Sequence, residues 1–435
     1  MSSDTIFALA SGAGRAAIAV IRLSGPLVSP LVEAVAGLTP TPRFAHYVRL
    51  RDPRSGETID RGLLLFFPVE SSPTGEDYAE LQIHGGRAVI DGFLTLFSET
   101  PGLRLAEPGE FARRSFANGR MDLSQVEGLA DLIDAETASQ RRQALQALGG
   151  GLRRRVEGWR EAVICGAALV EAELDFSDEG DVRDPAEQLR PLLEPQARDM
   201  EEMARQAPAA ERLRDGFLVL LLGPPNSGKS TLLNALARRD VAIVSAIPGT
   251  TRDMIEVHLD LGGLPVTLVD TAGLREAEDE IERLGVARTR ARIGEADLLL
   301  WLSEGGETLV GEEIVAGAAD SLRLATKTDI RAAGACDLAI SAQTGLGLEA
   351  LIAEIRWRAQ RRLGDGSSAV LTRERHRRLV EEAAAALRVC LEPGKPLEIV
   401  AEDLRAANRA LGRIVGSVDV EDVLDAVFAQ FCIGK

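Results

Sequence analysis

The sequence predicts a multidomain protein of the α/β and α classes, with an α+β region first and an α/β domain inserted into a helical one. Residues 1–118 alternate short apolar runs with Gly- and Pro-bearing turns, and helical periodicity begins near Asp122 and returns near the C-terminus. The segment between the two helical stretches contains apolar runs typical of buried strands around a phosphate-loop motif. The 435 residues leave room for two or three domains. We predict domains at residues 1–118, 119–212 with 367–435, and 213–366.

Apolar runs in the N-terminal region predict strands near residues 17–23, 63–69 and 79–83. Residues 12–17 superficially match a dinucleotide-binding fingerprint. The β-like run 18–21 follows, however, where that motif requires a helix. We therefore reject a dinucleotide site and expect an α+β domain.

Helical periodicity defines the next region and the C-terminus. Ser124 and Glu127 predict a capping box, and helical character continues to about Arg212. Residues 364–368 read as a linker. A domain can be inserted between the helical halves because the ends of a P-loop fold can lie close together at the surface. The last helix is expected to carry an apolar stripe of Val423, Leu424, Val427, Phe428 and Phe431.

Residues 223–230, Gly-Pro-Pro-Asn-Ser-Gly-Lys-Ser, fit the phosphate-binding loop G-x-x-x-x-G-K-[ST]. A strand-like run precedes them and a helix-like run follows, which is the context the motif needs. We expect backbone N–H groups to bind the phosphates, Lys229 to reach the β- and γ-phosphates as a catalytic group, and Ser230 to ligate magnesium. The alternative is a Gly-rich connector without a ligand. The predicted contacts here are Asn226, Ser227, Gly228, Lys229, Ser230 and Thr231.

Three later stretches, residues 249–253, 270–273 and 326–329, complete a guanine-nucleotide set in the order of a Ras-like P-loop GTPase domain. Asp270 ends an apolar run, so its carboxylate can hold magnesium through water. Asp329 selects guanine because a carboxylate accepts from both the ring N–H and the exocyclic amine. The predicted contacts are Asp270, Thr271, Ala272, Gly273, Thr326, Lys327 and Asp329, with Ser341 and Ala342 in the remaining base-side loop.

The chain departs from the common GTPase pattern at two positions. Thr326 stands where the motif usually has Asn, which removes an amide donor and leaves its effect on affinity open. Leu274 stands where GTPases commonly place the Gln that orients the attacking water. Another group must therefore orient the water. One candidate lies among the acidic residues 276–282, although these residues could instead form a solvated face. The other candidate is a cation near Asn226.

Lysine usage supports the motif assignments independently. Only four of the 50 basic residues are lysines, and Lys229 and Lys327 both lie in nucleotide motifs. A compact ammonium fits against phosphate or a base face where a forked guanidinium does not. Lys435, the last residue, becomes a candidate functional residue on the same reasoning.

Composition excludes several classes of protein. A net charge of −17 argues against a protein that coats nucleic acid by itself, and arginine clusters such as residues 153–155 could touch RNA or form a solvated helix face. The four cysteines are widely spaced, which suggests a reducing compartment. We find neither a signal peptide nor an apolar run of the roughly 18 residues that span a membrane. We expect a cytoplasmic protein.

Together with the GTPase set, residues 431–435 (Phe-Cys-Ile-Gly-Lys) and 118–125 (Asn-Gly-Arg-Met-Asp-Leu-Ser-Gln) closely resemble the MnmE (TrmE) family of tRNA modification GTPases. The resemblance implies an N-terminal folate-binding, dimerising domain and a potassium-activated G domain. It implies a homodimer that forms a heterotetramer with the FAD-binding protein MnmG. The resemblance further implies that the pair builds an aminomethyl-type (carboxymethylaminomethyl) group on C5 of the wobble uridine of certain tRNAs, with a tetrahydrofolate one-carbon unit in the 5,10-methylene or 5-formyl form.

The family pattern also implies roles for individual residues. Glu282 matches the residue that orients the attacking water, and Cys432 is either a nucleophile or a packing residue. Alternation alone would put Glu80 on a solvent face. The resemblance implies potassium neighbours Asn226, Ser245, Ile247 and Thr250, magnesium ligands Ser230 and Thr251, further GTP contacts Ser245, Thr250 and Thr251, and folate contacts Arg22, Glu80, Arg120 and Lys435.

A GTP-dependent assembly switch, for instance in ribosome maturation, is the alternative function. Its flanking domains would only bind partners. Tetrahydrofolate binding discriminates between the two, because only the modification enzyme needs the residues around Glu80, Arg120 and the C-terminal Cys-Ile-Gly-Lys.

Overall fold

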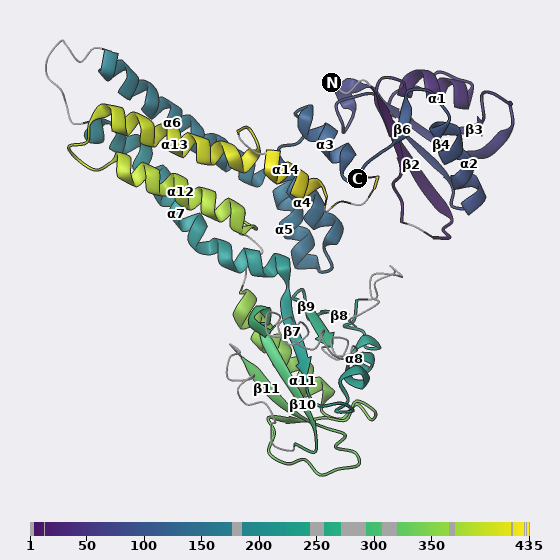
Figure 1. The fold of residues 1–435 in the computed structure, drawn as a ribbon, viewed down its shortest axis with the longest axis vertical. Helices are drawn as coiled ribbons and strands as arrows, with labels where there is room; N and C mark the ends of the chain where they lie inside the picture. Colours follow the sequence, from purple (N-terminus) through teal and green to yellow (C-terminus); the bar gives the residue numbers. More distant parts are fainter. Residues whose placement is uncertain are drawn as a thin grey trace, which may run out of the picture. The chain divides into compact units, whose positions relative to one another are not determined.

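The computed structural model describes residues 4–12, 14–175, 185–243, 256–270, 293–306, 320–364, 370–418, 421–429, 431, 433 and 434 (Figure 1). The chain divides into two compact units. The first comprises residues 1–130, 147–160 and 409–435, and the second comprises residues 131–146 and 161–408. The predicted combination of an α+β region, helices and an α/β sheet is confirmed. The domain boundaries stay predictions.

A six-stranded sheet of order β3-β4-β5-β2-β1-β6 forms the N-terminal region. All described pairs are antiparallel except β1 with β6. The predicted strands correspond to β2, β4 and β5, although β4 ends before Pro68, which has no N–H to give to a ladder. The strands are β1 (Thr5–Leu9), β2 (Ile18–Ser24), β3 (His46–Arg51), β4 (Thr58–Phe67), β5 (Tyr78–His84) and β6 (Leu103–Leu105).

Helices α1 (Val28–Ala36) and α2 (Arg87–Ser98) supply apolar side chains to one face of this sheet. Alternation along β2 directs Ile21 and Leu23 into that core and leaves Arg22 on the other face. The site described below lies on this second face, where Tyr78 packs with Phe111.

The helical segments following the sheet are α3 (Glu110–Ala117), α4 (Leu123–Asp134) and α5 (Ala138–Leu148). The predicted capping box at Ser124 is wrong by one half-turn. Asp122 caps α4 instead: its Oδ1 accepts the N–H of Gln125 at 3.0 Å, and the Gln125 side chain accepts the Asp122 N–H at 3.1 Å. Asp and Ser both favour this position, and Asp122 comes first in the chain.

The predicted C-terminal apolar stripe is confirmed for the side chains that the structure describes. Helix α14 (Glu421–Phe428) contributes Leu424, Val427 and Phe428 to a cluster with Val126 of α4, and Phe431 joins it. The cluster anchors the last turn of α14 beside α3 and the first two turns of α4, within the first unit.

Four long helices follow the pattern expected for the helical region: α6 (Gly151–Asp175), α7 (Pro185–Asp215), α12 (Glu374–Cys390) and α13 (Leu397–Val415). Helices α7 and α12 pack antiparallel in the second unit. Two ion pairs join them: Arg388 Nε lies 2.7 Å from Glu201 Oε1, and Arg377 Nε lies 2.9 Å from Glu211 Oε1. Helix α7 leads into the second sheet through Gly216.

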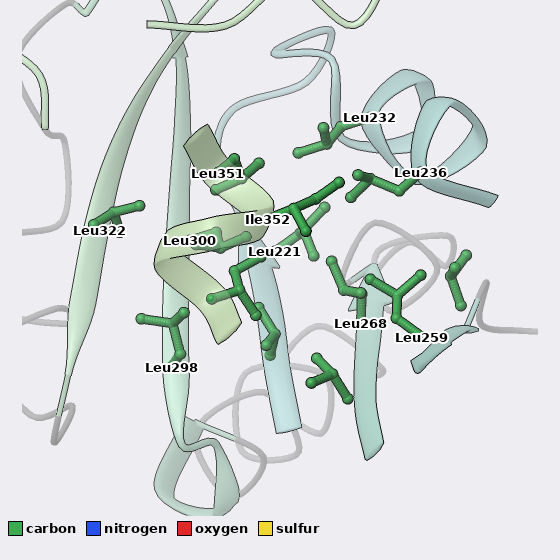
Figure 2. Packing of buried hydrophobic residues seen from close by; sticks show 14 of the residues in the cluster. Leu221, Leu232, Leu236, Leu259, Leu268, Leu298, Leu300, Leu322, Leu351 and Ile352 are labelled. Atoms are coloured by element: carbon green, nitrogen blue, oxygen red, sulfur yellow. The ribbon is translucent and has the colours of Figure 1, made fainter. Parts of the chain in front are cut away.

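The second sheet has the order β12-β11-β10-β7-β9-β8, and only β8 runs antiparallel to its neighbour. Leucines of α8 (Lys229–Ala237) and α11 (Leu348–Leu363) pack on one face of the sheet (Figure 2). This is the Ras-like α/β architecture predicted. The strands are β7 (Phe217–Leu222), β8 (Glu256–Asp260), β9 (Pro265–Asp270), β10 (Leu298–Glu304), β11 (Ser321–Thr326) and β12 (Leu338–Ala339).

Candidate functional site

The predicted phosphate loop connects the end of β7 to the start of α8. Three of its residues have positive φ, namely Gly223 (148°), Asn226 (64°) and Gly228 (94°). A Cβ on Gly223 would lie 2.2 Å from the carbonyl oxygen of Leu302, so only glycine fits there. The loop thereby turns directly into α8, whose first N–H groups have no partner within the helix and can bind an anion.

The buried side chain of Lys229 is hydrogen-bonded to the main chain of this loop. Its ammonium donates to the carbonyl oxygens of Gly223 at 3.0 Å and Pro224 at 3.1 Å, and the residue is only 8% exposed. A buried ammonium bound to neutral carbonyls places a positive charge at the loop where the motif binds phosphate.

Ser230 and Asp270 form the pair of oxygen donors expected beside the phosphates. The Ser230 hydroxyl donates to Oδ2 of Asp270 at 2.9 Å, and Asp270 is 2% exposed at the end of β9. A hydroxyl and a carboxylate are the hard oxygen ligands that magnesium prefers. The residues present therefore fit a magnesium ion next to the phosphate loop.

Thr326 connects the phosphate loop to the base-binding loop. Its hydroxyl donates to the carbonyl of Ser227 at 2.7 Å and lies 3.2 Å from the carbonyl of Ser303, and the residue is buried. The usual Asn amide is absent at this position, yet the hydroxyl still provides a donor to the phosphate-loop backbone.

The base-binding side is built from two loops that bind each other. The N–H of Thr328 in the first loop donates to the carbonyl of Ile340 in the second at 3.3 Å. Within the second loop, the N–H of Ser341 donates to the carbonyl of Leu346 at 2.9 Å. Lys327 has a positive φ of 56° and forms an ion pair with Glu304. Asp329 is exposed beside them. An exposed carboxylate on a fixed loop can accept hydrogen bonds from a guanine edge.

Two buried hydroxyls test whether a nucleotide fits this site. Ser227 Oγ in the phosphate loop and Thr328 Oγ1 in the base-binding loop are buried without a hydrogen-bond partner within the described part of the chain. Buried polar atoms are normally paired, so their positions fit a bound polar ligand. Several predicted site residues lie outside the described residues: Ser245, Ile247, Thr250, Thr251, Thr271, Ala272, Gly273, Glu282 and Lys435.

A second polar site lies on the open face of the N-terminal sheet. Arg22 and Glu80 are register partners on β2 and β5, and Arg22 Nε donates to Glu80 Oε1 at 3.1 Å. Arg22 Nη1 donates to the carbonyl of Gly434 at 3.3 Å, and the Tyr78 hydroxyl donates to Glu80 Oε1 at 2.7 Å. Burial, with Glu80 beside it, raises the pKa of Tyr78. The site thus joins two strands and the C-terminal tail.

Glu80 and Arg120 are two of the residues that the family resemblance assigns to this second site. Glu80 does not lie on a plain solvent face, because its side chain is 21% exposed and bound by Arg22 and Tyr78. Arg120 donates to the carbonyl of Val69. Sequence reasoning missed Tyr78, although it lies two residues before Glu80 and so on the same strand face.

A phosphate loop, a Ser-Asp pair and a Thr-Lys-Thr-Asp loop at the ends of strands in this order define a P-loop GTPase domain. Two family models match the chain: the GTP-binding protein TrmE N-terminus over residues 5–120 and the MnmE helical domain over residues 123–432. The chain belongs to the MnmE (TrmE) family of tRNA modification GTPases.

Full-length relatives agree with this assignment. The chain is 53% identical over 445 residues to the tRNA modification GTPase MnmE of Methylobacterium sp. (strain 4-46), covering 100% of both chains. It is 51% identical over 444 residues to that of Azorhizobium caulinodans, covering 100% of this chain and 99% of that protein. The G domain of the T. maritima FeoB iron transporter is 25% identical in sequence, with a TM-score of 0.26, and the match covers 33% of this chain and 99% of that chain. Among the described helices, none is long and apolar enough to cross a membrane.

Proposed function

We propose that the protein hydrolyses GTP to support formation of an aminomethyl-type (carboxymethylaminomethyl) group on C5 of the wobble uridine of certain tRNAs. The observation that carries this proposal is the joining of Arg22, Glu80 and the carbonyl of Gly434 at one site. A GTPase that served only as an assembly switch would have no need for a C-terminal tail held beside an acidic residue on a sheet face.

The GTPase half of the proposal rests on the described loop residues. Lys229 would stabilise charge on the β- and γ-phosphates, and Asp329 would select guanine. Magnesium, held by Ser230 and Thr251 with Asp270 nearby, would supply charge neutralisation at the phosphates. Ser230 already lies within hydrogen-bond distance of Asp270.

Potassium activation is proposed because Leu274 cannot orient water and Asn226 stands at the loop. Asn226 is exposed at the tip of the phosphate loop with a positive φ of 64°, so its side-chain oxygen is available to a cation. With Ser245, Ile247 and Thr250 it would hold a potassium ion, which supplies positive charge that stabilises the transition state. Glu282 would orient the attacking water.

Folate binding is proposed for the site around Glu80. A pterin edge carries N–H donors that suit the Glu80 carboxylate, and a glutamate tail carries carboxylates that suit Arg22, Arg120 and Lys435. Arg22 and Tyr78 both donate to one oxygen of Glu80, and this fixes the carboxylate on the sheet. A tetrahydrofolate in the 5,10-methylene or 5-formyl form would supply the one-carbon unit.

We further propose a homodimer that acts in a heterotetramer with an FAD-binding MnmG-type protein. The net charge of −17 supports joint binding of tRNA, because a strongly acidic chain neutralises few phosphates by itself. The flavin chemistry would then come from the partner.

The decisive experiment compares modified nucleosides in tRNA from cells with and without this protein. Loss of the C5 modification from wobble uridine is expected. Unchanged nucleosides with a defect in ribosome assembly would favour the assembly switch. Titration of the purified protein with a tetrahydrofolate separates the same alternatives, since only the modification enzyme should bind it.

A further inference from the structure

The C-terminal tail rests on a short loop, residues 107–109, that precedes α3. Pro108 forms an isolated antiparallel bridge with Ile433. A Cβ on Gly109 would lie 2.6 Å from the carbonyl oxygen of Phe428, so the end of α14 also packs directly on this loop. Both ends of the tail segment 428–433 therefore meet the same three residues.

Beyond this loop the tail meets the end of β1. Gly434 has a φ of 96°, and a Cβ there would lie 2.4 Å from the carbonyl oxygen of Leu9. The Gly434 carbonyl then accepts the hydrogen bond from Arg22. The placement of Gly434 thus depends on where Pro108 holds Ile433, one residue earlier.

Glu110, the first residue of α3, fixes the shape of the loop. Its Oε2 accepts the Glu107 N–H at 2.9 Å and Arg104 Nη1 at 2.8 Å, and its Oε1 accepts Arg104 Nη2 at 2.5 Å and Arg114 Nη2 at 3.1 Å. The Glu110 N–H in turn donates to the Glu107 carbonyl at 3.2 Å. Pro108 and Gly109 lie inside this closed pair of hydrogen bonds.

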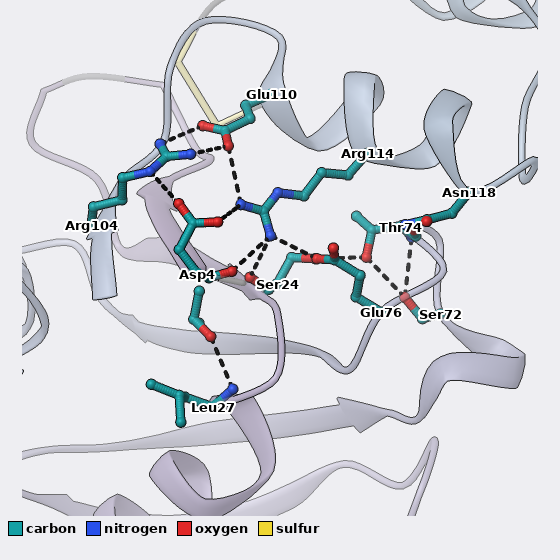
Figure 3. Close-up of polar contacts among 11 residues, drawn as sticks. Asp4, Ser24, Leu27, Ser72, Thr74, Glu76, Arg104, Glu110, Arg114 and Asn118 are labelled. Atoms are coloured by element: carbon teal, nitrogen blue, oxygen red, sulfur yellow. Dashed lines mark hydrogen bonds and ion pairs between the residues drawn. The ribbon is translucent and has the colours of Figure 1, made fainter. Parts of the chain in front are cut away.

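The carboxylate of Glu110 belongs to a larger, partly buried network (Figure 3). Arg114 is 6% exposed and also binds Asp4 at 3.0 Å and Glu76 at 2.8 Å. Its guanidinium donates to the main-chain carbonyl of Asp4 as well, at 3.0 Å. Removing such charges from water is costly, so a network of this kind is weak evidence for stability. Fixing the positions of the elements that it joins is the role its geometry supports.

We propose that Glu110 is a positioning residue that seats the C-terminal tail at the Arg22–Glu80 site. Glu110, held by Arg104 and Arg114, fixes the Glu107 N–H and with it Pro108, and Pro108 sets the position of Ile433. The seating of the tail stands on these contacts alone. The effect of this seating on folate binding rests on the proposed function above.

The substitution Glu110→Gln tests this proposal with little change in shape. All four partners of the Glu110 carboxylate are N–H donors. In either orientation the amide of glutamine therefore places its own N–H₂ group against two of them. A buried mismatch of this kind should open the loop and release the tail.

Hydrogen exchange of the full-length protein measures the seating directly. In Glu110→Gln we expect faster exchange in residues 107–109 and 431–435, by roughly 5- to 150-fold, which corresponds to a mismatch of about 1–3 kcal/mol. Exchange in α8 should stay unchanged. Glu99→Gln is the matched control, because Glu99 forms an exposed ion pair with Arg54 in the same unit. Unchanged exchange in residues 431–435 of a folded Glu110→Gln variant would overturn the proposal.

A second variant keeps the test decisive if Glu110→Gln fails to fold. Arg104→Met removes two of the four donors at a side chain that is 42% exposed. It should release the tail in the same direction but to a smaller extent. Protection of residues 431–435 equal to wild type in this variant would also overturn the proposal.

Titration with 5-formyltetrahydrofolate separates the two proposals. Weaker folate binding with GTP turnover unchanged is expected in Glu110→Gln and supports both. If the wild type binds no folate but Glu110→Gln still releases the tail, the positioning role is supported and the folate site is refuted. Normal folate affinity with a released tail would show that the seated tail is not part of the ligand site.

Discussion

The hydroxyl of Thr326 donates to the main-chain carbonyl of Ser227, 99 residues earlier in the chain, at 2.7 Å. This bond joins the end of β11 to the phosphate loop in the buried centre of the GTPase domain. The base-binding and phosphate-binding loops are therefore held as one unit, although the motif lacks its usual asparagine.

Replacing Thr326 by Val should weaken GTP binding, because the change keeps the shape and removes the donor. A buried carbonyl left without its partner costs about 1–3 kcal/mol, which corresponds to roughly 5- to 150-fold in Kd. Equilibrium titration with a fluorescent GTP analogue measures the effect. Thr326→Ser keeps the hydroxyl and is the control. Equal affinity for wild type and Thr326→Val would show that this bond does not support the nucleotide site.

Replacing Asp329 by Asn should exchange guanine for xanthine as the preferred base. The amide presents a donor where guanine also donates, and the loss of two charge-assisted hydrogen bonds predicts GTP binding weaker by about 100-fold or more. Competition between GTP and xanthosine triphosphate measures the preference. A variant that still prefers GTP would contradict the assignment of Asp329.

GTP hydrolysis should depend on the monovalent cation. We expect potassium to accelerate turnover over sodium by roughly 100- to 1000-fold, the range for one electrostatic group acting on a transition state. Initial rates at equal ionic strength in the two salts provide the measurement. Asn226→Ala should remove most of the difference. Equal rates in both salts would rule out the proposed cation site.

Deleting residues 432–435 should abolish tRNA modification and leave GTP hydrolysis intact. The tail binds Arg22 through the carbonyl of Gly434, whereas the nucleotide loops belong to the other compact unit. Nucleoside analysis and phosphate release on the truncated protein measure the two activities. Normal modification after truncation would mean that the tail has no part in the reaction.

Seating of the tail should be lost in acid. Burial opposes ionisation of Glu110, but hydrogen bonds from Arg104, the Glu107 N–H and Arg114 outweigh it, so its pKa is lowered from 4.5. A lowered pKa means that the stabilisation is complete above the unfolded value and disappears as the pH falls through the folded value. Protection of residues 431–435, corrected for intrinsic exchange, should be flat from pH 7 to about 5 and fall below about 4.

The Glu110→Gln variant supplies the control for this pH dependence. Two further carboxylates, Asp4 and Glu76, also bind Arg114, and the variant leaves both of them in place. Protection that falls by the same factor in wild type and variant would assign the acid effect to these neighbours instead.

The sequence by itself determined the nucleotide site wherever one contiguous segment does the work. A phosphate loop binds through successive backbone groups, so residues 223–230 could be identified from their spacing, and the buried-strand runs before them and at Asp270 located the sheet. The apolar stripe of α14 was likewise a local pattern.

Tertiary structure alone decided the contacts that depend on strand register and chain path. Arg22 meets Glu80 because β2 and β5 pair in one register, and a shift by one residue would turn Glu80 to the other face. No motif in the sequence pointed to Glu110. Glu107 and Arg114 lie three and four residues from Glu110, so those two contacts are local, whereas the path of β6 brings Arg104 to the same carboxylate.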